Sequence, residues 1–210
     1  MMSEIEIVKP MDIEKRSFEI ITERLNGRTF GPELDDIVKR VIHTSADFEY
    51  ADQLVFSEGV VEKALAAIKA GATIVTDTQM AWSGINKKIL ESFGGSAVCF
   101  MSDEDVAKEA KAREITRAMV SMEKAAGLEG PVIFAIGNAP TALIRIHELV
   151  AEQKLSPALI IGVPVGFVNV VEAKELIIQS KIPHIVARGN KGGSNIAAAI
   201  CNALLYKLRR

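Results

Sequence analysis

Residues 131–141 read PVIFAIGNAPT, and this stretch decides the class of fold. Residues 131–136 form a continuously apolar run, without the polar alternation of a strand that has one face in water. A short run of this kind predicts a strand whose two faces are both covered. The glycine, asparagine and proline that follow predict a turn out of the strand. The pattern is typical of a parallel sheet enclosed by helices.

The same rhythm recurs from residue 72 onward, where short apolar runs alternate with helical patterns. With right-handed crossovers, these runs predict an α/β fold of three layers. Its centre would be a doubly wound, mainly parallel five-stranded sheet, and such sheets bind ligands at the carboxyl ends of their strands. The predicted strands are residues 72–76, 97–101, 131–136, 158–163 and 184–187.

The first part of the chain predicts helices instead. Residues 12–25 carry apolar side chains at helical spacing, and Pro32 is expected in the first turn of a second helix. Ser57 is expected to cap a third helix, which ends at Gly71. We therefore predict a single domain of residues 1–210, in which a helical segment (1–71) packs on an α/β core (72–210).

The composition indicates a globular protein with an aliphatic core, since 49% of the residues are hydrophobic and only 5% are aromatic. A formal net charge of −2 gives no argument for nucleic acid or an anionic membrane as a partner. No apolar run reaches the ~18 residues of a membrane span, and the acidic start, MMSEIE, is unlike a signal peptide. Cys99 and Cys201 lie in apolar runs and are expected to be buried free thiols. A cytoplasmic location is expected.

The loops that follow the predicted strands hold the residues best suited to bind a ligand. Glycines there allow the backbone to approach a ligand closely, and the helix N-termini that follow favour anions. Arg188 and Lys191 add positive charge to the last of these loops, which is also rich in glycine. Several anion sites on one rim suit a polycarboxylate better than a single phosphate. Any one loop alone is better explained by ordinary turn chemistry, but for the basic, glycine-rich loop of residues 188–194 a functional role is favoured.

Two common nucleotide-binding motifs do not fit these loops. No G-x-G-x-x-G follows the first strand, which disfavours a dinucleotide site. Lys191 precedes Gly192 and Gly193, whereas the lysine of a P-loop follows its glycines. Anion binding by residues 188–194 stays open, and a nucleotide-dependent α/β enzyme is one alternative function.

The three histidines differ in their predicted surroundings. His147 and His184 lie among apolar residues, and structural roles are expected for both. His43 lies opposite the apolar stripe of its predicted helix, so it faces away from the core of its own chain. A surface histidine and a general acid that faces a ligand both fit this placement. Histidine suits the second role because it can hold and release a proton near neutral pH.

Two further positions are ambiguous from the pattern alone. Ser17 lies inside the apolar arc of the first predicted helix. Its hydroxyl either bonds the carbonyl one turn earlier, which is the commoner case, or donates to a ligand. Arg117 faces away from the apolar stripe of its helix, which by itself indicates a solvated charge.

Four segments, taken in order, resemble the precorrin-8X methylmutase family (precorrin isomerases, with the cobalt-precorrin-8 branch). The resemblance runs from about residue 17 to about residue 205. Asn190 stands where the family commonly has arginine, and residues 169–171 are larger than the family pattern, so individual carboxylate contacts differ. The four segments are RVIHTSAD (residues 40–47), GNAPTAL (137–143), GVPVGFV (162–168) and KGGS (191–194).

The resemblance implies a reaction and an assembly. The reaction is a suprafacial 1,5-shift of a methyl group from C-11 to C-12 of precorrin-8X or cobalt-precorrin-8. It gives hydrogenobyrinate or cobyrinate in cobalamin (vitamin B12) biosynthesis, with no cofactor and no bound metal. The assembly is a homodimer with the active site at the subunit interface. A non-catalytic corrinoid carrier is a second alternative, because it would bind the same macrocycle.

The resemblance also implies roles for single residues. His43 matches the catalytic histidine, and proton donation by it to a ring nitrogen would ease the migration, an effect of ~10²–10⁴-fold for a positioned acid. Ser17 matches a substrate-contacting position, and Arg40 and Arg117 match basic positions near the substrate. The candidate substrate-binding residues are Ser17, Arg40, Thr76, Arg117, Asn138, Arg188, Lys191, Gly192, Gly193 and Ser194.

Overall fold

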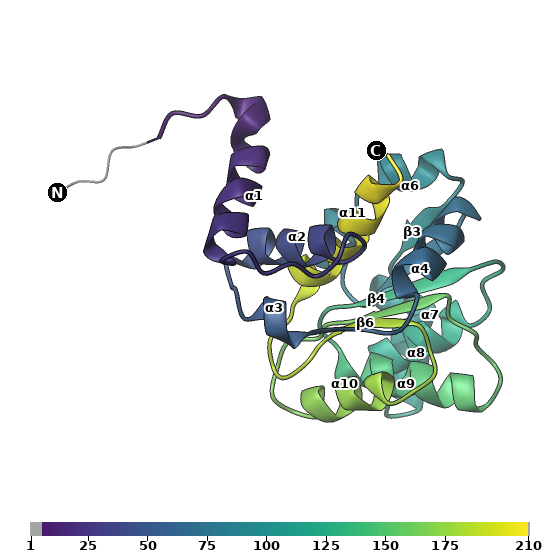
Figure 1. The fold of residues 1–210 in the computed structure, drawn as a ribbon. Helices are drawn as coiled ribbons and strands as arrows, with labels where there is room; N and C mark the ends of the chain where they lie inside the picture. Colours follow the sequence, from purple (N-terminus) through teal and green to yellow (C-terminus); the bar gives the residue numbers. More distant parts are fainter. Residues whose placement is uncertain (1–5, 210) are drawn as a thin grey trace.

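The computed structural model describes residues 6–209. Its centre is a six-stranded sheet in the order β1-β6-β5-β4-β2-β3 (Figure 1), and every neighbouring pair except β1 and β6 is parallel. The predicted α/β class and mainly parallel sheet are therefore confirmed. The strands are β1 (Leu54–Phe56), β2 (Thr73–Thr76), β3 (Ser96–Val98), β4 (Val132–Ile136), β5 (Leu159–Gly162) and β6 (His184–Ala187).

The predicted count of five strands is wrong, because β1 lies inside the segment predicted to be helical. This edge strand is too short to show a period of its own, and it pairs antiparallel with β6, Leu54 opposite Ala187. Ser57 continues the pairing: its N–H donates to the carbonyl oxygen of His184, and its Oγ accepts from the N–H of His184. Ser57 is therefore not a helix cap. Gly59, with φ of +64°, precedes the helix instead.

Helices cover both faces of the sheet (Figure 1), as a doubly wound fold requires. Alternate side chains of β4 enter different cores: Phe134 packs with α8, α9 and α10, and Ile133 packs with α2, α4 and α11. The layer on the side of Phe134 holds α8 (Arg117–Ala125), α9 (Pro140–Ala151) and α10 (Val170–Ile178), and α7 (Glu104–Ala112) packs on α8. The other layer holds α2 (Asp35–Ser45), α4 (Val60–Lys69), α5 (Gln79–Gly84), α6 (Lys87–Ser92) and α11 (Ser194–Lys207), with the short α3 (Tyr50–Gln53) beside β1.

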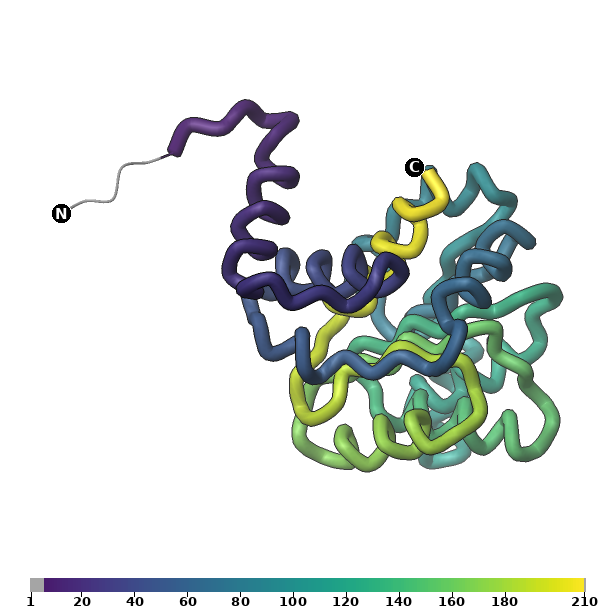
Figure 2. Tube along the Cα trace, viewed as in Figure 1, coloured from purple at the N-terminus to yellow at the C-terminus, as the bar shows by residue number. Residues whose placement is uncertain are grey.

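The N-terminal helix α1 (Ile13–Arg24) stands away from the sheet and packs on α2 through Ile21 (Figures 1 and 2). A short 3-10 turn, η1 (Pro10–Asp12), precedes α1, and a second, η2 (Phe100–Ser102), follows β3. Met11 and Ile13 are 94% and 55% exposed. Helix α2 begins at Asp35, later than predicted, because Pro32 lies in a turn closed by bonds to the carbonyl of Gly31.

The remaining structural predictions have mixed outcomes. Cys201 is buried, and burial raises the pKa of its thiol to about 12, but Cys99 is only partly buried, so the prediction of two buried thiols is half right. In residues 6–209 no helix is both long and apolar enough to cross a membrane. The prediction of no signal peptide rests mainly on residues 1–5, which lie outside the described residues.

Candidate active site

His43 lies in the last turn of α2 and is exposed, on the side of the helix predicted from the sequence. Its Nδ1 lies 2.7 Å from the Oγ of Ser17 on α1. The ring of Phe18, also on α1, lies 5.6 Å from the imidazole, centroid to centroid. Two consecutive residues of α1 thus orient an exposed imidazole. The sequence did not predict this bond, since it offered Ser17 only its own helix or a ligand as partner.

Arg40 joins this cluster one turn earlier on α2. Its guanidinium lies 5.2 Å from the ring centroid of Phe18 and 4.7 Å from that of Tyr206 on α11. Its NH2 group also lies 2.6 Å from a carboxylate oxygen of Glu14. Such cation–π contacts add ~0.5–1 kcal/mol each and hold the guanidinium in place. The structure therefore brings Ser17, Arg40 and His43 together around one aromatic ring.

A cavity of about 170 Å³ opens beside Ser17 and His43. Its other walls include apolar side chains of α1 and α2 and Phe48. Small-molecule sites usually measure roughly 300–1,000 Å³. The described chain therefore supplies only part of the enclosure that a large planar ligand needs.

The loop of residues 188–194, here called the last loop, lies at the carboxyl end of β6. The ammonium of Lys191 in this loop forms ion pairs with Asp47, at 2.5 Å, and Glu49, at 2.7 Å. Asp47 follows the end of α2, so the last loop is tied to the segment directly after the helix that carries His43. The α1–α2 cluster and the last loop therefore belong to one region of the molecule.

Gly192 and Gly193 let the last loop pack against the end of β5. A Cβ on Gly192 would lie 2.1 Å from the carbonyl oxygen of Val163, which leaves no room for a side chain. The N–H of Gly193 donates to the same oxygen, and its φ is +140°. Ser194, the first residue of α11, has its Oγ 2.7 Å from the Oγ1 of Thr78, so it joins the last loop to the end of β2.

Asp77 occupies one of the predicted anion sites. The carboxylate, 1% exposed, accepts hydrogen bonds from the backbone N–H groups of Gly137, Asn138 and Ala139 at 2.9, 2.8 and 2.6 Å. Burial raises the pKa of Asp77, while the three N–H donors act to lower it. The expectation of a free anion site after β4 is therefore wrong for these three donors. An acidic residue directly after a buried strand was the sequence signal that could have revealed this.

Thr76 does not face a ligand. Its side chain is fully buried, and its hydroxyl donates to the carbonyl oxygens of Thr78, at 3.0 Å, and Val98, at 3.4 Å. The proposed substrate contact of Thr76 is wrong in this structure, because the end of a central strand encloses the residue. Its hydroxyl instead supports the turn that presents Thr78.

The remaining candidates are exposed. Asn138 lies on the rim after β4. Arg117 begins α8, and the neighbouring Thr116 has its Oγ1 3.0 Å from that of Thr141 at the start of α9, so Arg117 lies near the same rim. Arg188 is 2.7 Å from Glu175 of α10, and this ion pair directs its guanidinium over α10.

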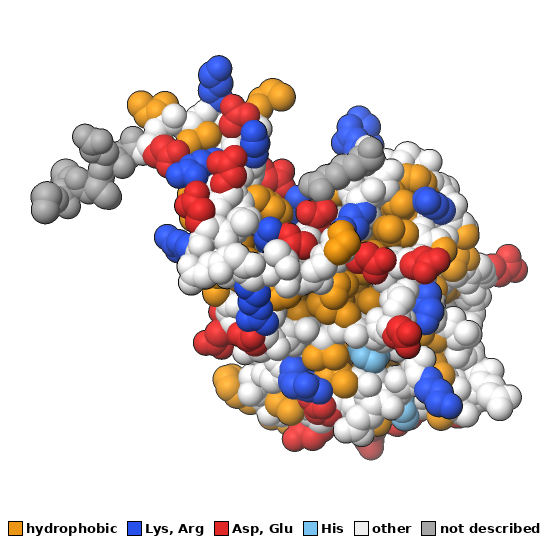
Figure 3. Space-filling model, viewed as in Figure 1, with side chains coloured by type: hydrophobic (Ala, Val, Ile, Leu, Met, Phe, Trp, Pro, Cys, Tyr) orange, Lys and Arg blue, Asp and Glu red, His pale blue; other side chains and the backbone are white. Residues whose placement is uncertain are grey.

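Charges of both signs are mixed on the face of the molecule that Figure 3 shows. Figure 3 shows acidic and basic side chains side by side on the projecting N-terminal segment, with apolar surface below it. An anionic ligand would therefore be bound by individual basic groups and not by a broad basic face.

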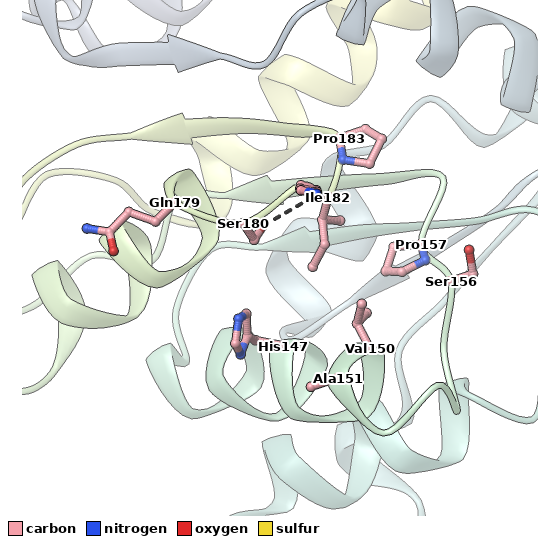
Figure 4. Close-up of a pocket in the computed structure, with 10 residues that line it drawn as sticks. His147, Val150, Ala151, Ser156, Pro157, Gln179, Ser180, Ile182 and Pro183 are labelled. Atoms are coloured by element: carbon pink, nitrogen blue, oxygen red, sulfur yellow. Dashed lines mark hydrogen bonds between the residues drawn. The ribbon is translucent and has the colours of Figure 1, made fainter.

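A larger cavity, of about 460 Å³, lies away from this region (Figure 4). Its lining includes His147, Gln179 and Pro183, at the C-terminal ends of α9 and α10 and just before β6. The candidate residues gather at the opposite, carboxyl end of the strands, so this cavity is not part of their site. His184 is buried, with its Nδ1 2.8 Å from the carbonyl oxygen of Ile182, which confirms its structural role.

Comparison with known proteins identifies the family. A family model described as precorrin-8X methylmutase matches residues 12–207. The cobalt-precorrin-8 methylmutase of Salmonella typhimurium is 45% identical over 209 residues, covering 97% of this chain and 98% of that protein. The precorrin-8X methylmutase of Pseudomonas aeruginosa is 36% identical, covering 91% and 93%.

A solved structure agrees with these sequence matches. The crystal structure of precorrin-8x methyl mutase from Thermus thermophilus superposes with a TM-score of 0.84 at 38% identity, covering 93% of this chain and 96% of that one. The fold, the length and the sequence thus agree over nearly the whole chain. The chain belongs to the precorrin-8X methylmutase family, isomerases that perform an intramolecular methyl transfer in cobalamin biosynthesis.

Proposed function

We propose that this chain moves the C-11 methyl group to C-12 of cobalt-precorrin-8 or precorrin-8X, with His43 as the proton donor. The observation that carries the proposal is the exposed imidazole of His43, oriented by Ser17 and placed beside Arg40. A sigmatropic shift needs no nucleophile from the protein. It needs a held macrocycle and an acid at the right nitrogen.

The bond to Ser17 supports a definite proton path. In the imidazolium, Nδ1–H donates to the Oγ of Ser17, and Nε2–H is the proton that can pass to a ring nitrogen of the substrate. After transfer, the neutral ring keeps Nδ1–H on Ser17, and Nε2 can take the proton back. In this path Ser17 accepts from Nδ1–H throughout the cycle, so that Nε2 is the atom that exchanges the proton.

Basic side chains of the α1–α2 cluster and of the last loop are proposed to bind the carboxylates of the substrate. Each of them has an acidic partner in the free chain. Arg40 pairs with Glu14, Lys191 pairs with Asp47 and Glu49, and Arg188 pairs with Glu175. A substrate carboxylate would displace or share these partners. The net gain is the strength of the new charge-assisted hydrogen bond less that of the ion pair it replaces. Arg117 and Asn138, both exposed at the rim after β4, are proposed to contact the substrate as well.

We further propose a homodimer whose two chains enclose the substrate together. The cavity beside His43 is too small to hold a macrocycle, which supports a second wall from a partner. Helix α1 projects from the body and carries exposed apolar residues at its start (Figure 1). A cytoplasmic location, as expected for a biosynthetic enzyme of this class, is part of the same proposal.

Cobalt-precorrin-8 is the substrate to test first. The relatives from Salmonella typhimurium and Priestia megaterium, at 45% and 44% identity, are named cobalt-precorrin-8 methylmutases. The relative from Pseudomonas aeruginosa, at 36%, is named for the metal-free compound. The cobalt, where present, belongs to the substrate.

The decisive experiment follows the visible spectrum of each substrate with wild-type protein and with His43→Ala and His43→Phe. Conversion by the wild type, with binding but no conversion by the variants, is the expected result. Unchanged turnover by the variants would reject His43 as the acid. Binding by the wild type without conversion of either substrate would indicate a carrier. A thermal shift with ATP or NAD and none with a corrinoid would favour a nucleotide-dependent enzyme.

A further inference from the structure

Lys174 of α10 is a fully buried lysine beneath the last loop. Its ammonium donates to the carbonyl oxygens of Gly189, at 2.7 Å, and Lys191, at 2.8 Å. Burial lowers its pKa to about 8. Among the described residues, no carboxylate forms an ion pair with it. A buried charge held only by carbonyls costs stability compared with an apolar side chain of similar size. Lys174 therefore calls for an explanation other than stability.

The two bonds determine how two peptide groups of the last loop are turned. The carbonyl of Gly189 shares a planar trans peptide with the N–H of Asn190, and that of Lys191 shares one with the N–H of Gly192. In a trans peptide the C=O and N–H point in opposite directions. By holding both carbonyls, Lys174 directs both N–H groups to the opposite side of the loop. Neither N–H donates to an acceptor within residues 6–209.

Backbone N–H groups on one side of a loop, with a positive charge behind them, favour an anion. Asn190 is exposed and Gly192 is partly exposed, so a ligand can reach both N–H groups. Lys191, between them, has an ammonium that reaches Asp47 beyond α2, so this part of the loop adjoins the segment that follows His43. A carboxylate is the anionic group that the proposed tetrapyrrole substrate carries.

We propose that Lys174 is a positioning residue, which turns the last loop so that the N–H groups of Asn190 and Gly192 bind a carboxylate of the tetrapyrrole. The inference rests on the proposed function, since it takes the last loop as part of the substrate site. Lys174 itself does not touch the substrate. It acts through the loop and through the field of its ammonium.

Three charged groups around the last loop, those of Asp47, Arg188 and Lys191, have pKa values shifted away from pH 8. The hydrogen bond between Lys191 and Asp47 raises the pKa of Lys191 and lowers that of Asp47, and Glu49 adds to the effect on Lys191. Glu175 raises the pKa of Arg188. A change in affinity centred near pH 8 therefore reports on Lys174 among these groups. The neutral amine can still donate its bonds, but the charge that polarises the two peptides is lost.

The test measures the affinity for the reaction product, cobyrinate or hydrogenobyrinate, so that no turnover occurs. Wild type is compared with Lys174→Met and with Lys174→Arg. The control is Lys181→Met, which removes an exposed lysine just after the C-terminal end of α10. Lys174→Met should weaken binding about tenfold at pH 7, the effect of about one charge-assisted hydrogen bond. The affinity of the wild type for the product should fall by a similar factor between pH 7 and pH 9. Lys174→Arg should restore part of the affinity without this pH dependence, and Lys181→Met should behave as wild type.

Two further readouts separate positioning from a structural role. With saturating substrate, kcat of Lys174→Met should stay within about threefold of wild type, while KM rises with Kd. Its melting temperature should be no lower than that of wild type. Unchanged product affinity in Lys174→Met overturns the inference. A loss of product affinity also overturns it if the melting temperature falls as well and Lys174→Arg does not restore the affinity. If Lys174→Met does not fold, a wild-type affinity equal at pH 7 and pH 9 overturns it. Failure of wild type to bind or convert any tetrapyrrole rejects the proposed function instead.

Discussion

The Oγ of Ser17 on α1 lies 2.7 Å from the Nδ1 of His43 on α2, so this contact between a hydroxyl and the proposed acid joins two helices. Helix α1 packs on α2, and its position decides whether this contact exists. The orientation of His43 therefore depends on the docking of a helix that otherwise projects from the molecule (Figure 1).

Removal of this hydroxyl should slow the reaction without preventing binding. Ser17→Ala leaves the imidazole free to rotate and to change tautomer, and we expect kcat to fall roughly 10–100-fold, less than for His43→Ala. Single-turnover absorbance measurements give the rate, and titration with product gives the affinity. The matched control is Thr22→Ala on the same helix, whose hydroxyl bonds the carbonyl of Phe18. Equal rates for Ser17→Ala and Thr22→Ala would contradict the proposed role of Ser17.

Gly192 should not tolerate a side chain. The Cβ of alanine would lie 2.1 Å from the carbonyl oxygen of Val163, so the last loop must move away from β5. We expect Gly192→Ala to lower the free energy of unfolding by roughly 1–3 kcal/mol and to weaken product binding. Gly127→Ala is the control, since its Cβ would find its nearest neighbour at 3.5 Å and should change stability by less than about 0.5 kcal/mol. Urea denaturation of both variants checks this, and equal stabilities would show that the loop relaxes freely.

Asp77 should be essential to the stability of the rim between β2 and β4. Asp77→Asn replaces an acceptor of three N–H bonds with an amide that turns one donor toward them. We expect a loss on the order of 3 kcal/mol in the free energy of unfolding. Asp105→Asn, which breaks an exposed ion pair with Lys124, should change the free energy of unfolding far less than Asp77→Asn does. Denaturation midpoints that match for the two variants would refute this role.

Lys174 should make stability depend on pH in a predictable direction. Its pKa is about 8 in the folded chain and 10.5 in the absence of the fold. Between these values the unfolded chain binds more protons than the folded chain, so the free energy of unfolding contributed by this group rises with pH. Wild type should therefore gain stability relative to Lys174→Met from pH 8 to pH 10, and at pH 7 the variant should be at least as stable. Urea denaturation at four pH values measures the difference, and a constant difference would contradict the low pKa.

The class of fold and the exposure of His43 could be read from local patterns in the sequence. Continuous apolar runs such as residues 131–136 require two covered faces, and a parallel sheet between helices is the arrangement that covers both. The opposition of His43 to its own apolar stripe predicted its exposure, because helix periodicity alone decides which face a residue takes. Strand β1 escaped prediction, since a segment as short as Leu54–Phe56 has no readable period and forms only because β6 offers a free edge.

What the tertiary structure decided are the contacts between residues far apart in sequence. The carboxylate of Asp77 accepts the hydrogen bonds of the N–H groups after β4. Thr76 is enclosed at a strand end, and Lys174 holds the carbonyls of two peptides of the last loop. None of these contacts leaves a pattern along the chain, because each depends on which loops meet at the carboxyl edge of the sheet. The sequence by itself determined the layers of the fold and the face on which His43 stands. Only packing in three dimensions decided which polar groups are already satisfied within the chain and which stay available to a ligand.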